Sequence, residues 1–351
     1  MNINTSVFGN LSNQSRIDKI DLINKNNIKV SILTYGGIIQ SIETPNEKGI
    51  LKDIVLGYDD LDGYLNDPYY IGAIIGPVAG RISNAQIPLN GNIVQLDANA
   101  GNNQLHGGPD GLNTKVWNAK TETLQNSVKL ELKCFAKDGE SGYPGNREFT
   151  TTYILNNKNQ LLIYFDVVSD KDTVVNMTSH SYFNLSDKEN DGIDEHLVMI
   201  NSLKTLATNK ELMPNGEFEY ILGKPTNFSR GKSLKNALME QAEGFDHLYI
   251  INKEEGKFSI TAKVVHQESG RVIELYTEQP GLVFYTNNAA DGKIIGKNNH
   301  PIIKQGAFCL EPQKFTDAPN HPNFPSIKLK ANQKYSSRNQ FNFGLASDTH
   351  H

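Results

Sequence analysis

Cysteine is scarce in this sequence. Its 351 residues contain two cysteines, Cys134 and Cys309. They form neither a disulfide framework nor the paired Cys/His spacing typical of a structural zinc site. The sequence therefore predicts a reduced, cytoplasmic protein and no metal site. A disulfide-stapled secreted scaffold is excluded.

Long apolar runs and an excess of basic residues are also missing. No window of eighteen or more apolar residues occurs, so no transmembrane helix is expected. Residues 1–18 have neither a basic nor an apolar leader segment, so no signal peptide is expected. The net charge is −5 and the pI is about 6.0. This acidic balance argues against nucleic acid or an anionic membrane as partner.

Helical patterning is weak throughout. The best window is 233–242, where Ser233 is a suitable N-cap and Gly244 a suitable stop. Strands and helices do not alternate, and no glycine-rich phosphate loop stands at a strand-to-helix junction. These absences exclude a nucleotide-binding α/β fold.

Patterns typical of β-strands occur along the whole sequence. In residues 128–134, Val128, Leu130, Leu132 and Cys134 alternate with charged residues, as expected of a half-buried antiparallel strand. Segments 28–33, 149–155 and 161–168 are further strand candidates, and 258–275 indicates a hairpin turning at Gly270. These patterns predict an all-β sandwich or barrel. We expect one domain over residues 1–345 and a disordered tail over 346–351.

The stretch Ala307–Pro325 is the strongest candidate for chemistry. Its apolar strand ends at Glu311, directly before Pro312. Proline removes a backbone donor and biases the preceding residue to extended geometry, so Glu311 is expected at a strand end. A stiff loop with three further prolines follows. Such a position could hold a carboxylate still over a cleft, although most glutamates are ordinary surface residues.

Four other polar residues lie among strand and turn signals: Arg81, His106, His180 and Asp246. Taken singly, none is specific. The histidines lack zinc-motif spacing, and the serines beside His180 lack a nucleophile-elbow frame. Glu311 with Asp246 could formally serve a glycosidase, which needs two carboxylates. A histidine–glutamate pair fits acid–base proton transfer at neutral pH better.

Seven ordered motifs together resemble the aldose 1-epimerase (galactose mutarotase) family. They are GPVAGRISNA (Gly76–Ala85), NQLHGG (103–108), DGESGYPGN (Asp138–Asn146), SHSYFNL (179–185), GFDHLY (244–249), QPGLVFYTNN (Gln279–Asn288) and CLEPQKFTDAPNHPNFP (309–325). The resemblance runs from residue 33 to residue 325. Departures are small: Thr316 replaces a common proline, and Ser179 replaces a common asparagine. Neither removes a group that the chemistry needs.

The resemblance implies a large antiparallel β-sandwich and a role for each matching residue. Glu311 matches the family's general base, His180 its general acid, and His106 a histidine close to the sugar ring oxygen. The implied substrate-binding residues are Arg81, Asn84, Asp246, Gln279 and Phe284. The implied reaction exchanges the anomers of free hexoses such as galactose or glucose through the open-chain aldehyde. It requires no cofactor and no metal.

Alternatives of two classes stay open at the level of sequence. A hexose-phosphate 1-epimerase would need further basic residues converging on the cleft. A non-catalytic carbohydrate-binding sandwich would need no acid–base pair. The partner expected in each case is a small sugar. The sequence decides neither the preferred hexose nor whether the protein is a monomer or a homodimer.

Overall fold

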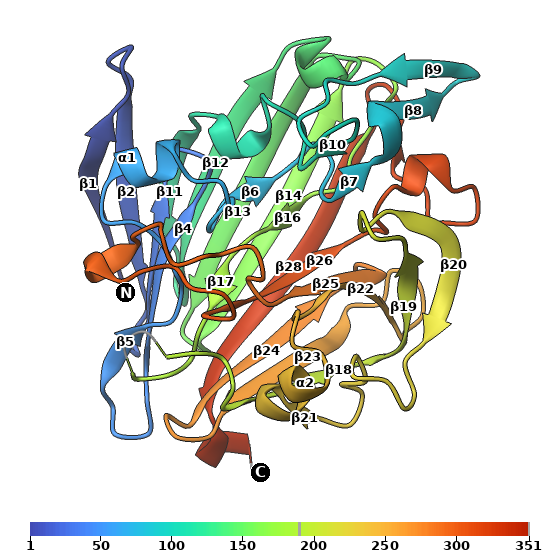
Figure 1. Cartoon of the computed structure of the whole chain (residues 1–351). Helices are drawn as coiled ribbons and strands as arrows, with labels where there is room; N and C mark the ends of the chain where they lie inside the picture. Colours follow the sequence, from blue (N-terminus) through green and yellow to red (C-terminus); the bar gives the residue numbers. More distant parts are fainter. Residues whose placement is uncertain (189–190, 350–351) are drawn as a thin grey trace.

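The computed structural model describes residues 1–188 and 191–349, and its regular secondary structure consists mainly of antiparallel strands (Figure 1). Within these residues the strands form a five-stranded, a nine-stranded and a six-stranded sheet, here called the N-terminal, large and small sheets, with four two-stranded pairs beside them. The described α-helices are α1 (Leu61–Leu65) and α2 (Leu234–Glu240), both too short to cross a membrane. The predicted all-β sandwich is confirmed.

The N-terminal sheet is a simple meander at one side of the molecule, in the blue part of Figure 1. Its strands, in spatial order, are β1 (Asn2–Asn10), β2 (Arg16–Ile23), β3 (Lys29–Leu33), β4 (Ile39–Pro45) and β5 (Leu51–Asp53). β3 confirms the strand expected over 28–33. Gly36 and Gly37, with φ of +63° and +56°, make the tight turn between β3 and β4.

The large sheet shows the alternation that the sequence predicts. Val128, Leu130, Leu132 and Cys134 are buried, while the residues between them are at least partly exposed. The hairpin predicted over 258–275 is formed by β23 (Ser259–His266) and β24 (Arg271–Thr277), with Gly270 in the turn at φ +71°. In spatial order the strands are β11 (Asn118–Thr123), β12 (Ser127–Ala136), β13 (Arg147–Asn156), β14 (Gln160–Ser169), β28 (Lys334–Leu345), β24 (Arg271–Thr277), β23 (Ser259–His266), β18 (His196–Ile200) and β21 (Lys232–Ser233).

The small sheet carries three of the candidate residues, Glu311, Asp246 and Phe284. Its middle strands pair through Cys309 with Tyr285 and through Glu311 with Val283. In spatial order the strands are β17 (Tyr182–Phe183), β26 (Phe308–Gln313), β25 (Gly281–Tyr285), β22 (Asp246–Ile251), β19 (Ser202–Thr208) and β20 (Pro214–Tyr220).

Short paired strands and 3₁₀ turns connect the sheets. The pairs are β10 (Gln104–Leu105) with β7 (Arg81–Ile82), β15 (Thr173–Val174) with β27 (Lys328–Leu329), β16 (Thr178–Ser179) with β6 (Ile74–Ile75), and β8 (Gln86–Leu89) with β9 (Asn92–Gln95). The 3₁₀ turns are η1 (Ser83–Ala85), η2 (Leu112–Thr114), η3 (Glu140–Gly142), η4 (Lys297–Asn299), η5 (Ala318–Asn320) and η6 (Ala346–Thr349).

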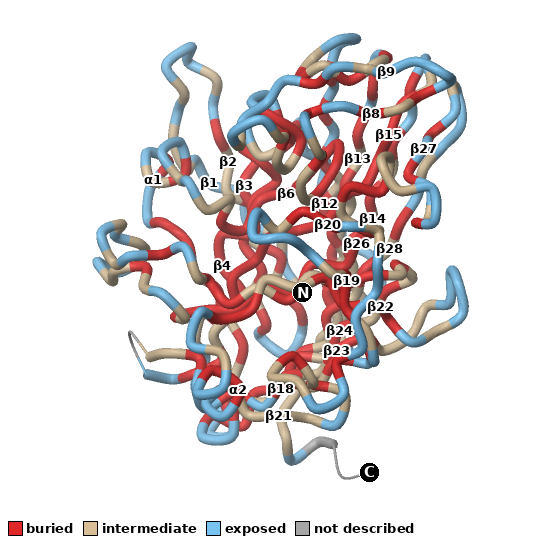
Figure 2. The backbone as a smooth tube through the Cα atoms, turned by 45° about the vertical axis from the view of Figure 1, so that its right-hand side comes forward, coloured by how far each residue is buried: buried red, intermediate tan, exposed pale blue. Residues whose placement is uncertain are grey.

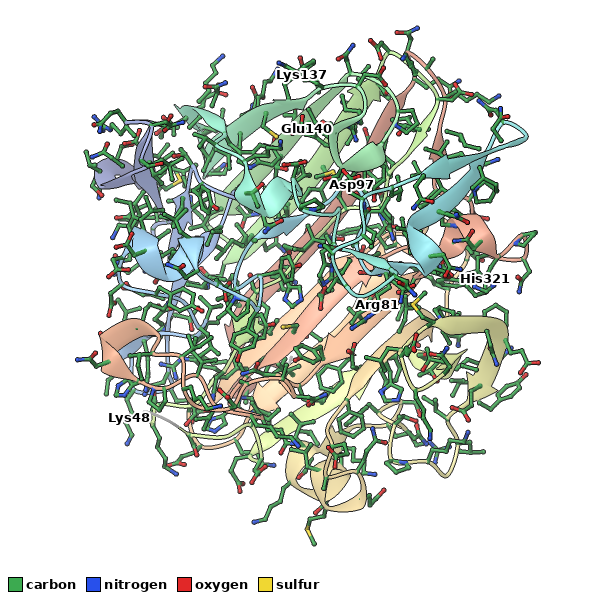
Figure 3. The ribbon with its side chains drawn as sticks, turned by 45° about the horizontal axis from the view of Figure 1, so that its top comes forward. Lys48, Arg81, Asp97, Lys137, Glu140 and His321 are labelled. Carbon is green, nitrogen blue, oxygen red and sulfur yellow. The ribbon has the colours of Figure 1, made fainter. Side chains whose placement is uncertain are left out.

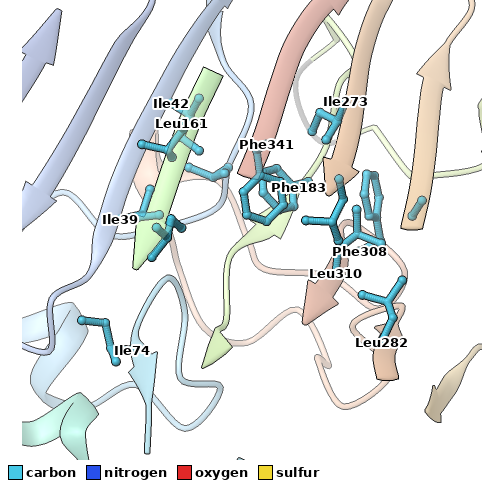
Figure 4. Packing of buried hydrophobic residues seen from close by; sticks show 14 of the residues in the cluster. Ile39, Ile42, Ile74, Leu161, Phe183, Ile273, Leu282, Phe308, Leu310 and Phe341 are labelled. Carbon is cyan, nitrogen blue, oxygen red and sulfur yellow. The ribbon is translucent and has the colours of Figure 1, made fainter. Parts of the chain in front are cut away.

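One continuous hydrophobic core joins the three sheets, and buried backbone fills the centre of the molecule (Figure 2). Phe183 of β17 lies between Phe308 of β26 and Phe341 of β28, with ring centroids 5.9 and 5.5 Å apart (Figure 4). The even-numbered residues Phe308 and Leu310 therefore anchor β26 in the core. Because side chains alternate along a strand, Cys309, Glu311 and Gln313 face the opposite side.

Three boundaries differ from the sequence-based expectation. Glu311 lies inside β26, which continues through Pro312 to Gln313. The proline is tolerated because β17 pairs with β26 only at Phe308 and Cys309, so Pro312 meets no strand of the small sheet on that side. α2 ends at Glu240, slightly before the expected stop. Residues 346–349 of the expected disordered tail form η6, and 350–351 lie outside the described residues.

Candidate active site

A cavity of about 600 Å³ opens over the odd-numbered face of β26. Its wall includes Glu311 and His180 at the base, with Arg81, His106 and Asp246 around them. These five residues come from chain segments up to 230 positions apart (Arg81 to Glu311, 311 − 81). The fold thus brings together the acid–base candidates and two of the candidate sugar-binding residues.

Glu311 and His180 form the closest titratable pair in the cavity. Nε2 of His180 lies 3.5 Å from Oε1 of Glu311, and both side chains are almost fully buried. The backbone of His180 is fixed by hydrogen bonds from its N–H to Ala73 and from Gly72 to its carbonyl. Burial lowers the pKa of His180 to about 4. Burial, reinforced by the Asp246 carboxylate, raises the pKa of Glu311 well above its ordinary value.

The β7–β10 pair places Arg81 and His106 side by side, because Arg81 pairs with Leu105. The Gly80 N–H donates to Nδ1 of His106 at 3.2 Å. A backbone N–H can only donate, so Nδ1 is unprotonated and His106 carries its hydrogen on Nε2. Burial and the nearby His180 and Arg81 charges hold the pKa of His106 well below its ordinary value. His106 is thus a neutral Nε2–H donor.

The turn after His106 depends on Gly107. Its φ is +93°, and a Cβ at this position would lie 2.0 Å from the Gly76 carbonyl oxygen. No side chain fits at that distance, so only glycine allows the turn to pack against residues 76–77.

Asp246 begins β22 and pairs with Tyr285 across the small sheet. Burial raises the pKa of Asp246, and the positive charge of Arg81 opposes that shift. Arg81 extends from β7 and is labelled in Figure 3. The two residues therefore place opposite charges at the cavity, which suits a ligand rich in hydroxyl groups.

Four tyrosines that the sequence analysis did not single out line the same cavity, Tyr69, Tyr70, Tyr182 and Tyr285, and the last three contact its histidine rings. The Tyr182 ring stacks on His180 with centroids 5.0 Å apart, and the Tyr70 ring contacts His106 at 4.8 Å. Tyr285 meets the His180 ring edge-on at 6.4 Å. These aromatic contacts fix the imidazole planes. Tyr182 and Tyr285 could have been found from strand alternation; Tyr70 lies in a loop without a comparable signal.

Three expected substrate-binding residues do not line the cavity. Phe284 points into the core against Phe228 and Phe245, because its neighbours Val283 and Tyr285 occupy the cavity face of β25. Gln279 precedes β25 and donates to the Tyr335 hydroxyl at 3.3 Å. Asn84 is exposed on η1, with φ +51°. The expected sugar contacts of these three residues do not fit this geometry.

The cavity base also contains a group with metal-ligating atoms. Among the described residues, His180, Cys309 and Glu311 offer ligand atoms within 4.8 Å of one another. However, Sγ of Cys309 approaches Nδ1 of His180 at 3.6 Å, whereas Glu311 approaches Nε2. Cys309 and Glu311 thus contact opposite nitrogens of the His180 ring. This arrangement fits a chain of polar contacts better than a site around one shared ion.

Comparisons with known proteins agree with this fold. The family model described as aldose 1-epimerase matches residues 18–342. Galactose mutarotase of Bos taurus is 35% identical over 348 residues, covering 99% of this chain and 100% of that protein. The Homo sapiens galactose mutarotase is also 35% identical, covering 98% and 99%. A Caenorhabditis elegans structure described as a GalM/aldose epimerase homologue has a TM-score of 0.85 at 26% identity, covering 93% and 98%.

Proposed function

The chain belongs to the aldose 1-epimerase family and is an isomerase of that type, and we propose that it interconverts the α and β anomers of free aldohexoses such as galactose and glucose. The observation that carries this proposal is the buried pair of His180 and Glu311, 3.5 Å apart at the base of the cavity. Acid–base ring opening needs one group that accepts a proton and one that donates it, held against the same ring.

In the proposed reaction, Glu311 removes the proton from the C1 hydroxyl while His180 donates the proton on Nε2 to the ring oxygen. The C1–O bond of the ring breaks, and the C1 hydroxyl oxygen becomes the aldehyde oxygen. The aldehyde then rotates about the C1–C2 bond. Closure returns both protons by the reverse steps and produces the other anomer.

The burial of the pair supports this sequence of states. The bound cyclic sugar requires ionised Glu311 and protonated His180, whereas the open aldehyde is accompanied by the neutral pair. Burial disfavours charge on both groups, as the directions of their pKa shifts show. Burial therefore favours the neutral pair that accompanies the open aldehyde over the ionised pair that starts ring opening.

Three further residues are proposed to hold the sugar. His106 donates from Nε2 toward the ring oxygen region, since its other nitrogen is occupied by Gly80. Arg81 donates to hydroxyl oxygens, and Asp246 accepts from hydroxyl hydrogens. Together they orient the anomeric carbon over the Glu311–His180 pair.

A phosphorylated hexose is a weaker candidate. Among the described residues, Arg81 is the one lysine or arginine in the cavity wall, and its charge acts on Asp246. A phosphate of roughly two negative charges is usually bound by several cationic or backbone donors. The cavity is better matched to a neutral sugar.

Polarimetry of freshly dissolved α-D-galactose and α-D-glucose tests the proposal. We expect the wild-type protein to accelerate relaxation, and Glu311→Gln and His180→Asn each to lower kcat by roughly 10²–10⁴-fold. His106→Asn should be less severe, because it removes a positioning donor. Glu148→Gln, an exposed change on β13, is the matched control and should leave kcat unchanged.

Three outcomes would count against the proposal. Undiminished turnover in Glu311→Gln would remove this residue from the mechanism. Failure of the wild-type protein to accelerate either sugar would favour a phosphorylated substrate or a sugar-binding protein without catalysis. Cleavage of an aryl glycoside would instead indicate a glycosidase.

A further inference from the structure

Gln313 is a buried polar residue whose hydrogen-bonding capacity is unused. It is 1% exposed and lines the cavity. Neither its amide oxygen nor its amide nitrogen has a hydrogen-bond partner among the described residues. Of the cavity-lining residues that the structure describes, it is the one with such an unpartnered buried side chain. An unsatisfied buried polar group is destabilising, so its presence calls for an explanation.

The position of Gln313 on β26 explains both its direction and its lack of partners. It is two residues beyond Glu311, so both side chains leave the strand on the cavity side. Its neighbour on β25 is Gly281, which has no side chain to offer a partner. On the other edge, β17 pairs with β26 only as far as Cys309. The neighbouring strands therefore supply no hydrogen-bond partner for the Gln313 amide, and the amide can bind a ligand in the cavity.

We propose that Gln313 binds a substrate hydroxyl remote from the anomeric carbon and so contributes to the choice of sugar. The inference rests on the proposed aldohexose substrate. A primary amide offers one acceptor oxygen and two donor hydrogens, and a sugar hydroxyl both accepts and donates. Alternate residues of a strand lie about 6.6–6.8 Å apart. A pyranose with C1 at Glu311 thus presents a different hydroxyl, on the far part of its ring, toward Gln313.

The neighbouring wall fits this assignment. Val283 and Leu248 line the cavity beside Glu311 and provide apolar contact for the C–H groups of a sugar ring. Thr316 also lines the cavity, and its hydroxyl lies near Gly80, the residue before Arg81. Gln313 thus completes a set in which reactive, apolar and hydroxyl-binding groups occupy separate parts of one cavity.

The test compares Gln313→Leu with wild type, because leucine keeps a similar volume and removes the amide. We expect KM for galactose to rise about 10-fold, the loss of one or two neutral hydrogen bonds. kcat should change by less than about 3-fold, because Gln313 does not reach the reacting atoms. Tm should not fall, because the variant removes an unsatisfied buried amide. An unchanged KM would overturn the proposal, whether or not Tm falls.

Gln40→Leu is the matched control. Gln40 is also buried, but it does not line this cavity, and its amide donates to the Tyr58 carbonyl at 3.3 Å. This variant should lower Tm and leave KM unchanged. The two glutamine variants therefore separate a ligand-binding amide from a structural one.

Monodeoxy galactoses identify the hydroxyl that Gln313 contacts. With wild type, the sugar lacking that hydroxyl should show the same roughly 10-fold rise in KM, and Gln313→Leu should add nothing further for that sugar. Equal additional losses for every deoxy sugar would overturn direct recognition. Calorimetric titration of galactose into wild type and Gln313→Leu distinguishes this inference from the proposed function. Wild-type binding without mutarotation would reject the proposed function alone, whereas equal affinity of the two proteins would reject the inference alone.

Discussion

The protonation states of His106 and His180 depend on the groups that contact their ring nitrogens. His106 is neutral because a backbone N–H occupies its Nδ1 atom. His180 lies between the thiol of Cys309 and the carboxyl group of Glu311, one on each ring nitrogen. Because Nε2 of His180 and Oε1 of Glu311 lie 3.5 Å apart, the proton that these two groups share belongs to the pair rather than to either residue. The pH dependence of the reaction therefore reports the pair.

We expect kcat/KM to be constant from about pH 5 into the neutral range and to fall as the pH approaches 4. The pKa of His180 is lowered to about 4 and that of Glu311 is raised. Between the two values the pair holds one proton. Below the lower value it holds two, and no base is left. Polarimetry between pH 3.5 and 8 measures this profile, with circular dichroism at each pH as the control for folding. A midpoint near pH 6.5 would show that His180 titrates as an exposed histidine.

At the scale of elements, short strand pairs position the site more than long ones do. β7 and β10 contribute two residues each, yet their pairing sets Arg81 beside His106. β16 pairs with β6 immediately before His180. In β26, alternation divides the strand between a core face with Phe308 and Leu310 and a cavity face with Glu311 and Gln313. Rigid strands on a packed core can hold an acid–base pair within the tolerance that proton transfer requires.

Gly107→Ala should disturb the element that carries His106. The added Cβ would lie 2.0 Å from a backbone oxygen at a φ of +93°. We expect a loss of about 2 kcal/mol or more in the free energy of unfolding, together with reduced kcat/KM. Chemical denaturation and polarimetry measure the two effects.

Gly101→Ala is the control for backbone conformation alone. Its φ is +63°, but a Cβ there meets no atom within 4 Å. A loss of roughly 1 kcal/mol with unchanged activity is expected. Equal behaviour of the two variants would mean that the close approach at Gly107 is unimportant.

At the scale of the whole molecule, the three sheets share one core. Residues from β2 to β28 belong to the same buried cluster, including Ile20, Phe183 and Phe341. The cavity lies over the small sheet and is closed by segments that precede it in the chain. This arrangement supports our proposal that residues 1–345 are a single domain.

A single domain should unfold in one cooperative transition. Trp117, the one tryptophan of the sequence, is buried in the shared cluster near the N-terminal sheet, so its fluorescence reports that region. Far-UV circular dichroism reports all strands. We expect the two signals to have the same midpoint in urea. Distinct midpoints would indicate that the N-terminal sheet unfolds independently.

The sequence by itself determined the fold class, because the period-two alternation of strands such as 128–134 is a local property of the chain. It also indicated Glu311, His180, His106, Arg81 and Asp246, since polar residues inside apolar motifs stand out and the ordered motifs match one family. Only the tertiary structure decided which neighbours face the cavity. Phe284 and Tyr285 are adjacent in sequence, but one packs in the core and the other lines the cavity. The unpartnered amide of Gln313 could not be foreseen either, because hydrogen bonding in a sheet depends on strands that are distant in sequence.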